Sequence, residues 1–364
     1  MTEIERSESG WSPDWATHPG EHLLERIEVH GWSQAEFARR AGLTGKLVSE
    51  IITGKNPVTP DTAIKLEHVL GLKDYIWLGI QADWDLHQLK QHQRTKLDKQ
   101  REVAQRFPLK ELKARNVLPK TDDLGALVDG LLSFLGIGSL EAWRSAYGCF
   151  AVQHREAKAH ASTYEHLFAW LTVGEHRARE MNLPEFDSKK FAHAVAEARS
   201  LTCEGVEVFL PKLTGLCQAA GVALICEPPF PKVAVYGSAR WVDGDTRAII
   251  QLSLRAKSND HFWWTFFHEC GHITLHRGKS FADDLYASGS KAEDEANAYA
   301  ERVLYGQGGA GPVLDRATRS VQGVCMLAEE LGLHPGILVG LFQHHELLSH
   351  KFMNGLKDRF AWRE

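Results

Sequence analysis

One very apolar helix limits what this chain can fold into. From Asp260 to Leu275 the sequence reads DHFWWTFFHECGHITL, so the apolar runs FWWTFF and ITL flank an H-E-x-x-H pattern. A helix that is apolar on several sides needs cover from other elements. Strand-like segments precede it in the sequence, and we expect them to form a small sheet that packs on this helix.

The polar residues of the helix have the spacing of a metal site. His268 and His272 are four residues apart, so both imidazoles lie on one helix face and can reach one ion. Glu269 lies beside them, where a carboxylate can hold a water. The same pattern also arises by chance in a chain with 19 histidines, so further ligands are needed to support the prediction.

A site of this type requires a third protein ligand. Glu293, near the start of a second predicted helix over 292–304, is the preferred residue, and Asn297, one turn later, can hold a ligand histidine in place. Glu295 is the alternative, although it lies about 200° around the helix from Glu293. His276 falls about 80° off the face of His268 and is a less suitable ligand.

Periodicity predicts a chain that is mainly α, with one small α+β domain. Strands are expected over Val222–Cys226, Val233–Tyr236 and Arg247–Leu254, and helical spacing elsewhere. The predicted organisation is a tail over 1–19, an all-α domain over 20–88, a basic linker helix over 89–120, a helical middle region over 121–200, the α+β core over 201–310 and C-terminal helices over 311–364.

The N-terminal domain contains the layout of a helix-turn-helix. In GWSQAEFARRAGLTGKLVSEIITGK, Ser33 is a predicted N-cap, Gly42 lies at the turn and Thr44 opens the second helix. The outer face of this helix is expected to meet base edges, while residues at the two ends of the motif suit phosphates. The predicted DNA contacts are Gln34, Thr44, Gly45, Lys46, Ser49 and Lys55, with Glu50 on the same outer side. Paired helices of this kind also pack ordinary helical domains.

Charge is unevenly distributed along the chain. The net charge of -5 argues on its face against a nucleic-acid partner. Residues 90–120, however, hold ten Lys and Arg against three Asp and Glu, a local charge of +7. We expect a helical lever with a solvated early part and an end anchored by Val103, Phe107, Leu109 and Leu112. This basic segment would add DNA contacts, and as an exposed segment it is a candidate site for cleavage.

The segment from His18 to about Leu89, including SQAEFARRAG, SEIITGK and TPDTAIKLEHVLG, resembles the Xre-type domain of HigA-like antitoxins. The resemblance implies a dimeric repressor domain that binds double-stranded operator DNA, with a cognate toxin as a further partner.

Residues from about Leu201 to Leu304, including TRAIIQLSL, HECGH and EDEANAYA, resemble the ImmA/IrrE metallopeptidase family. The resemblance implies that His268, His272 and Glu293 bind the metal and that Glu269 is the general base. It also implies that the substrate is an Xre-type repressor or this chain itself. Zinc is the first choice on ligand type, with manganese as the alternative. The chain departs from the family in Leu304-Tyr305-Gly306 and in Cys270, whose helical direction favours a packed thiol.

Two functions are therefore expected. The first is a DNA-binding regulator fused to a metallo-endopeptidase, and the alternative is a non-catalytic HigA-like repressor whose metal domain senses or stabilises. The chain start MTEIERSESGW lacks the basic and apolar parts of a signal peptide, and the six cysteines include no C-x-x-C pair. We expect a cytoplasmic protein without a membrane partner.

Overall fold

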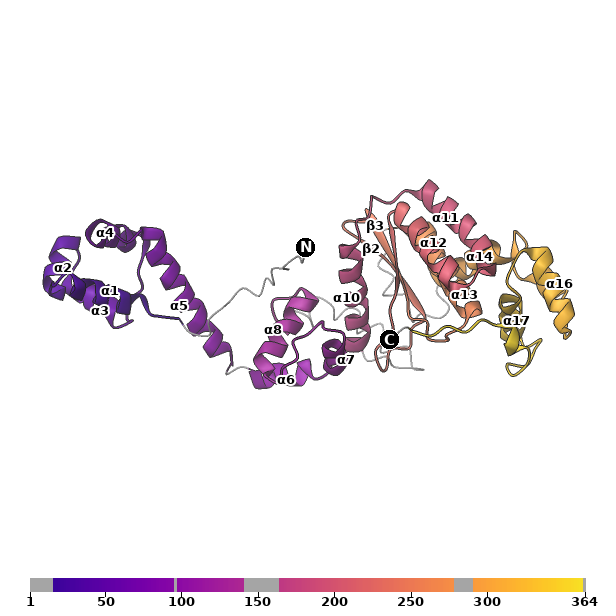
Figure 1. The fold of residues 1–364 in the computed structure, drawn as a ribbon, viewed down its shortest axis with the longest axis horizontal. Coiled ribbons are helices and arrows are strands. Elements are labelled where there is room, and N and C mark those ends of the chain that lie inside the picture. The colour runs from indigo at the N-terminus through magenta and orange to yellow at the C-terminus, as the bar shows by residue number, and fades with distance from the viewer. Residues whose placement is uncertain (1–15, 95–96, 141–163, 278–290, 363–364) are drawn as a thin grey trace, which may run out of the picture. The chain divides into compact units, whose positions relative to one another are not determined.

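The computed structural model describes residues 16–94, 97–140, 164–277 and 291–362 (Figure 1). The chain divides into two compact units, residues 1–100 and 101–364, each described by itself below. Most of the predicted N-terminal tail and part of the helical middle region lie outside the described residues, as do residues 278–290 of the predicted α+β core.

Five helices lie wholly within the described part of the first unit, which is all-α, as predicted. They are α1 (Pro19–Val29), α2 (Gln34–Ala41), α3 (Gly45–Ile52), α4 (Pro60–Leu70) and α5 (Asp74–Arg94). Their apolar faces meet around Phe37, Val48 and Trp77, none of which is exposed to solvent. Four of these helices begin with a side-chain cap. His18, Ser33, Thr44 and Thr59 each accept a hydrogen bond from a backbone N–H of the first turn.

The predicted linker helix is not one helix in the structure. Helix α5 continues to Arg94, and α6 (Leu97–Ala104) and α7 (Leu109–Ala114) follow. Phe107, Leu112 and Leu118 are at most 3% exposed, so the later part of this segment is packed into the second unit. The burial of Val103, Phe107 and Leu112 agrees with their predicted role as anchors of the end of this segment. The expectation that the segment is exposed as far as Lys120 does not hold for this packed part.

The second unit is built around a three-stranded sheet of order β1-β3-β2. Strand β1 (Val222–Cys226) runs parallel to β3 (Arg247–Leu252), and β2 (Gly237–Val242) runs antiparallel to it. The prediction placed the second strand too early, over Val233–Tyr236. The sequence does not predict the strand over Gly237–Val242 because the strand contains a charged residue, Arg240. In the structure this arginine is buried, since Glu175 neutralises its guanidinium and Gln251 accepts a hydrogen bond from it.

Helices cover both faces of this sheet (Figure 1). The strands are contacted by α10 (Tyr164–Glu180), α12 (Val206–Ala219) and α13 (Asn259–Leu275). The other described helices after α7 are α8 (Leu124–Leu135), α11 (Ser188–Ser200), α14 (Lys291–Tyr305), α15 (Gly311–Leu314), α16 (Val321–Leu331) and α17 (Pro335–His344). Alternate residues of β3 point to opposite faces, so Ile250 joins the core that includes α13 while Ile249 joins the cluster that includes Ala178 of α10. The predicted apolar helix is thus covered by the sheet, as expected.

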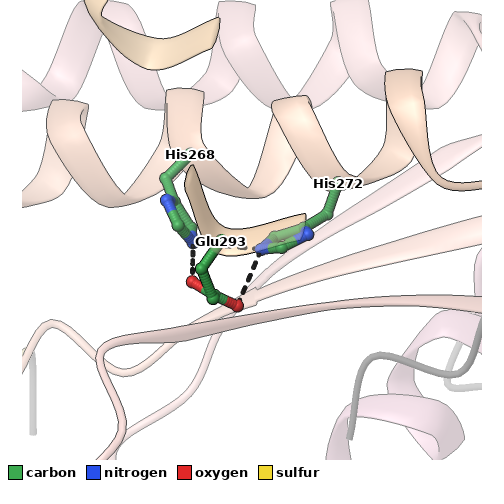
Figure 2. A group of neighbouring side chains, drawn as sticks. All are labelled: His268, His272 and Glu293. Carbon is green, nitrogen blue, oxygen red and sulfur yellow. Dashed lines mark hydrogen bonds and ion pairs between the residues drawn. The ribbon is translucent and has the colours of Figure 1, made fainter. Parts of the chain in front are cut away.

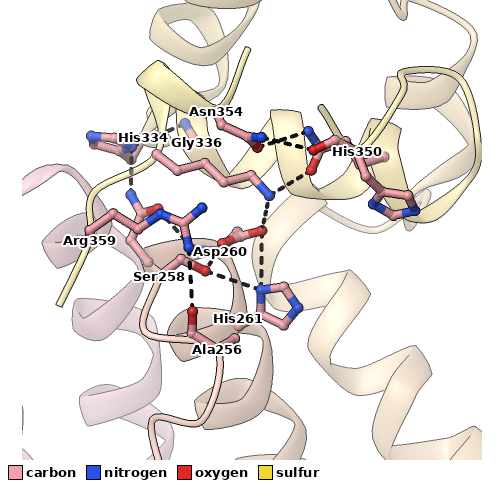
Figure 3. A network of polar contacts seen from close by, with 12 residues as sticks. Ala256, Ser258, Asp260, His261, His334, Gly336, His350, Asn354 and Arg359 are labelled. Carbon is pink, nitrogen blue, oxygen red and sulfur yellow. Dashed lines mark hydrogen bonds and ion pairs between the residues drawn. The ribbon is translucent and has the colours of Figure 1, made fainter. Parts of the chain in front are cut away.

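The C-terminal segment is tied to the start of α13 by polar contacts (Figure 3). The Lys357 ammonium lies 2.6 Å from a carboxylate oxygen of Asp260, and both side chains are 6% exposed. Gln343 of α17 accepts a second hydrogen bond from the same ammonium. The backbone pairs as well, because Ser258 and Arg359 form an antiparallel bridge.

Within the described part of the chain, no single helix has the length and apolar character needed to cross a bilayer. Helices α16 and α17, bent by 112° at the break between them, meet that test only as a pair.

Candidate metal centre

Two histidine side chains of α13 meet on one face of the helix (Figure 2). His268 and His272 are one turn apart, and their Nε2 atoms are 3.0 Å from each other. His272 is 3% exposed, whereas His268 is partly accessible. The four-residue spacing therefore brings two nitrogen donors to one point, as the sequence predicts.

The third donor comes from α14. The carboxylate of Glu293 lies 3.1 Å from His268 Nε2 and 3.3 Å from His272 Nε2. One ligand atom from each of the three residues lies within 4.8 Å of the others, and Figure 2 shows the carboxylate facing both rings. Glu293 thus occupies the position predicted for the third ligand, and Glu295 lies outside this cluster.

Close packing of α13 on α14 sets this geometry. Gly271, within the H-E-x-x-H pattern, has no side chain to separate the helices. A Cβ built there would lie 3.0 Å from Ala296 Cα and 3.2 Å from Tyr299 Cβ. Ala296 is three residues from Glu293, so the point of closest approach lies beside the ligands.

Each histidine also has a polar partner at its second nitrogen. Asn297 Oδ1 lies 3.0 Å from His268 Nδ1, the contact predicted for this residue. His272 Nδ1 lies 3.3 Å from His276 Nδ1, and His276 Nε2 lies 2.9 Å from Glu295 Oε2. His276 and Glu295, which the sequence makes less suitable as ligands, therefore lie next to the His268–His272–Glu293 cluster.

Glu269 lies inside the protein, against the first residue of β2. It is 4% exposed, and a Cβ on Gly237 would come within 2.6 Å of its Oε1. Burial, assisted by the nearby charge of Glu293, raises the pKa of Glu269 to about 7. Such a carboxyl group can exchange a proton near neutral pH.

The electrostatics of the cluster favour an ionised Glu293. Burial alone would raise the pKa of this carboxyl, but its contacts with His268 and His272 outweigh burial and lower the pKa to about 2. Two imidazoles and one carboxylate are a donor set typical of catalytic zinc sites. The residues therefore fit a zinc ion. Cys270 is fully buried and burial raises the pKa of its thiol, so it is a packed thiol, as its helical direction predicts.

The predicted DNA contacts lie together on the first unit. Gln34, Thr44, Gly45, Lys46, Ser49 and Lys55 are all exposed. The Thr44 hydroxyl is already used as a cap for α3, where it accepts from the N–H of Leu47 at 3.1 Å. Glu50 accepts a hydrogen bond from Asn56 at 2.7 Å, which holds its carboxylate at the end of α3.

Comparisons with known proteins bear on this first unit. Residues 24–78 match the protein family described as helix-turn-helix. An uncharacterised HTH-type transcriptional regulator, YddM of Escherichia coli strain K12, is 37% identical over 68 residues, which make up 19% of this chain and 72% of the relative. The chain belongs to the helix-turn-helix family. This helix-turn-helix protein is also similar to virulence-associated protein I of Dichelobacter nodosus, at 31% identity over 77 residues, 21% of this chain and 71% of the relative.

One solved structure similar to this helix-turn-helix protein is an addiction module antidote protein of a HigA family from Coxiella burnetii. It is 27% identical, with a TM-score of 0.22, and the match covers 23% of this chain and 91% of that chain. The helix-turn-helix predicted from the sequence is thus confirmed. The likeness of residues 201–304 to the ImmA/IrrE family stays a prediction.

Two contacts beside the His268–His272–Glu293 cluster could not be predicted from the sequence. The His272–His276 and His276–Glu295 contacts need two helices to be placed against each other, and angular arguments within one helix do not provide this. The signal that was present is the further four-residue step from His272 to His276, which continues the spacing of His268 and His272 to the end of α13.

Proposed function

We propose that this protein is a DNA-binding transcriptional regulator whose second unit is a zinc-dependent endopeptidase. The observation that carries the enzymatic half is the meeting of His268, His272 and Glu293, with a buried carboxyl, Glu269, one residue from His268. The regulatory half is supported by the helix-turn-helix and by the HTH-type regulator similar to it.

The roles of the residues follow from their placement. His268, His272 and Glu293 would hold zinc, and Asn297 would keep the His268 ring in orientation. When bound, zinc lowers the pKa of a water and polarises a peptide carbonyl. Glu269 accepts the proton that this water loses and passes it to the departing amine.

The proposed substrate is a helix-turn-helix regulator of the Xre type, or a copy of this chain. Proteolysis occurs preferentially at exposed loops, so the packed segment from Val103 to Leu118 is unsuited as a cleavage site in the folded protein.

The test of the enzymatic half uses the full chain with zinc, incubated with itself and with a panel of Xre-type regulators. The change Glu269→Gln removes the proton acceptor and keeps the ligands, so it is expected to lower cleavage by about 10²- to 10⁴-fold while zinc still binds. Asp294→Asn, at an exposed position of α14, is the matched control and should cleave like the native chain. If the Glu269→Gln chain cleaves as fast as the native chain, or if the native chain binds no zinc, the proposed endopeptidase activity is wrong.

The test of the regulatory half measures binding to fragments of the protein's own upstream DNA at several salt concentrations. Lys46→Ala is expected to weaken binding and to reduce its salt dependence. Lys65→Ala, on α4 and paired with Asp61, is the control with little effect. If the Lys46→Ala and Lys65→Ala chains bind DNA equally well, the assignment of the outer face of α3 as the DNA-binding surface is wrong.

A non-catalytic repressor is the alternative, because a helix-turn-helix by itself accounts for the similarity to the HTH-type regulator. In that case Glu269→Gln would leave gene regulation in cells unchanged, whereas loss of DNA binding would abolish it.

A further inference from the structure

His276 and Glu295 form a chain of polar contacts that begins at a proposed metal ligand. The two Nδ1 atoms of His272 and His276 are 3.3 Å apart, and His276 Nε2 is 2.9 Å from Glu295 Oε2. His276 is 5% exposed, so its ring is held within the protein at the end of α13. Glu295 is 43% exposed at its side chain and also lies 3.5 Å from the Lys291 ammonium.

The direction of these hydrogen bonds follows from the chemistry of imidazole. A histidine that binds a metal through Nε2 is neutral and carries its proton on Nδ1. The Nδ1–H of His272 therefore donates to His276 Nδ1, which must be the unprotonated nitrogen. His276 then carries its own proton on Nε2 and donates it to the Glu295 carboxylate. Every donor in this chain meets an acceptor.

We propose that His276 and Glu295 are positioning residues for the zinc ligand His272. His276 fixes the ring orientation and the tautomer of His272, and Glu295 in turn fixes the tautomer of His276. Asn297 does the same for His268 through a single contact at 3.0 Å. The two ligand histidines are thus oriented by different means, an amide for one and a histidine with a carboxylate for the other.

The placement of these residues on α13 and α14 supports this role. Glu293 and Glu295 are two residues apart on α14 and point in different directions, so one reaches the ligand cluster and the other reaches the far side of His272. One short stretch of α14 therefore supplies a donor to the metal and an acceptor to the contact chain. The inference rests on the proposed zinc site, and its test separates the two.

The experiment measures zinc affinity of the full chain by competition with a chelating dye, and the visible spectrum of the same chain loaded with Co²⁺. His276→Leu removes the acceptor for His272, and we expect zinc to bind about 10- to 100-fold more weakly and the cobalt bands to shift. His276→Asn keeps a side-chain acceptor and should recover part of the affinity. Glu295→Gln retains an acceptor oxygen without the charge, so its loss should be smaller than that of Glu295→Ala.

Asp294→Asn is the matched control on α14, and it should leave both the affinity and the spectrum unchanged. Urea unfolding of each metal-free chain separates positioning from loss of fold, because the proposal requires weaker zinc binding at unchanged metal-free stability. If the His276→Leu chain binds zinc as tightly as the native chain with the same cobalt spectrum, or weakens only in proportion to a loss of metal-free stability, the positioning role is wrong and the zinc site stands. If the native chain binds neither ion, the proposed function fails and this inference fails with it.

Discussion

Replacing Gly271 by alanine tests whether close packing of α13 on α14 builds the metal centre. The added Cβ would lie 3.0 Å from Ala296 Cα and 3.2 Å from Tyr299 Cβ, whereas carbon atoms in ordinary contact are about 3.5–4.0 Å apart. Because the closest atom belongs to the backbone of α14, no side-chain rotation relieves the contact. The helix must therefore move by about 0.5 Å.

Two effects of this change have known sizes. Overpacking costs about 1–3 kcal/mol of unfolding free energy. Alanine in place of glycine within a helix contributes about 1 kcal/mol in the other direction. The displacement also carries Glu293 away from the two histidines by more than the roughly 0.2 Å over which ligand distances vary in a metal site. We therefore expect lower metal-free stability and weaker zinc binding together.

Gly215→Ala supplies the matched control. Gly215 lies within α12, is exposed, and has no atom within 4 Å of its built Cβ, so only the helical preference changes. Urea unfolding should place the Gly215→Ala chain above the native chain by up to about 1 kcal/mol, and the Gly271→Ala chain about 1–3 kcal/mol below the Gly215→Ala chain. If both chains are equally stable and bind zinc equally, close packing does not set the site.

Three further changes test other parts of the structure. Lys357→Met leaves the Asp260 carboxylate buried without its cation and should cost about 3–5 kcal/mol in urea unfolding, part of which Asp260→Asn in the same chain should restore. Burial alone would raise the pKa of Asp260, but hydrogen bonds from His261, Lys357 and Ser258 hold the pKa well below its ordinary value. The ionised Asp260 carboxylate therefore stabilises the fold above about pH 4, and this stabilisation is lost as the pH falls. In an acid titration followed by circular dichroism, the loss of helical signal with falling pH should be less steep for the Asp260→Asn chain than for the native chain. Thr44→Ala removes the cap of α3 and should cost about 0.5–2 kcal/mol, whereas Thr44→Ser should retain most of it; equal melting of both variants would contradict the capping role.

Local periodicity explains why the ligands could be predicted. The spacing of His268 and His272 is fixed by the helix itself, and the same angular reasoning separated Glu293 from Glu295 on a second helix. Neither step needed the tertiary structure beyond the assumption that the two helices meet. The apolar flanks of α13 supplied that assumption, because they require cover.

Where contacts cross between elements, the sequence was a poor guide. The second strand was misplaced because Arg240 is buried in β2 through partners on α10 and β3, namely Glu175 and Gln251. In the basic segment the apolar anchors could be predicted, but the contacts of Arg115 with Glu227 and with the carbonyl of Pro228 could not. A charged residue usually indicates an exposed position, but Arg240 and Arg115 are paired with glutamates far away in the sequence, Glu175 and Glu227.

The link between Lys357 and Asp260 has a consequence for the order in which the protein is made. The helix that carries His268 and His272 begins almost a hundred residues before the lysine that neutralises its first turn. On a ribosome, domains form as their residues emerge, so α13 is synthesised while Asp260 still lacks its cation. The ion pair at the start of this helix forms only after synthesis has reached Lys357. A chain that ends before Lys357 is therefore expected to be less stable at the start of α13, because the buried Asp260 carboxylate lacks its ammonium partner.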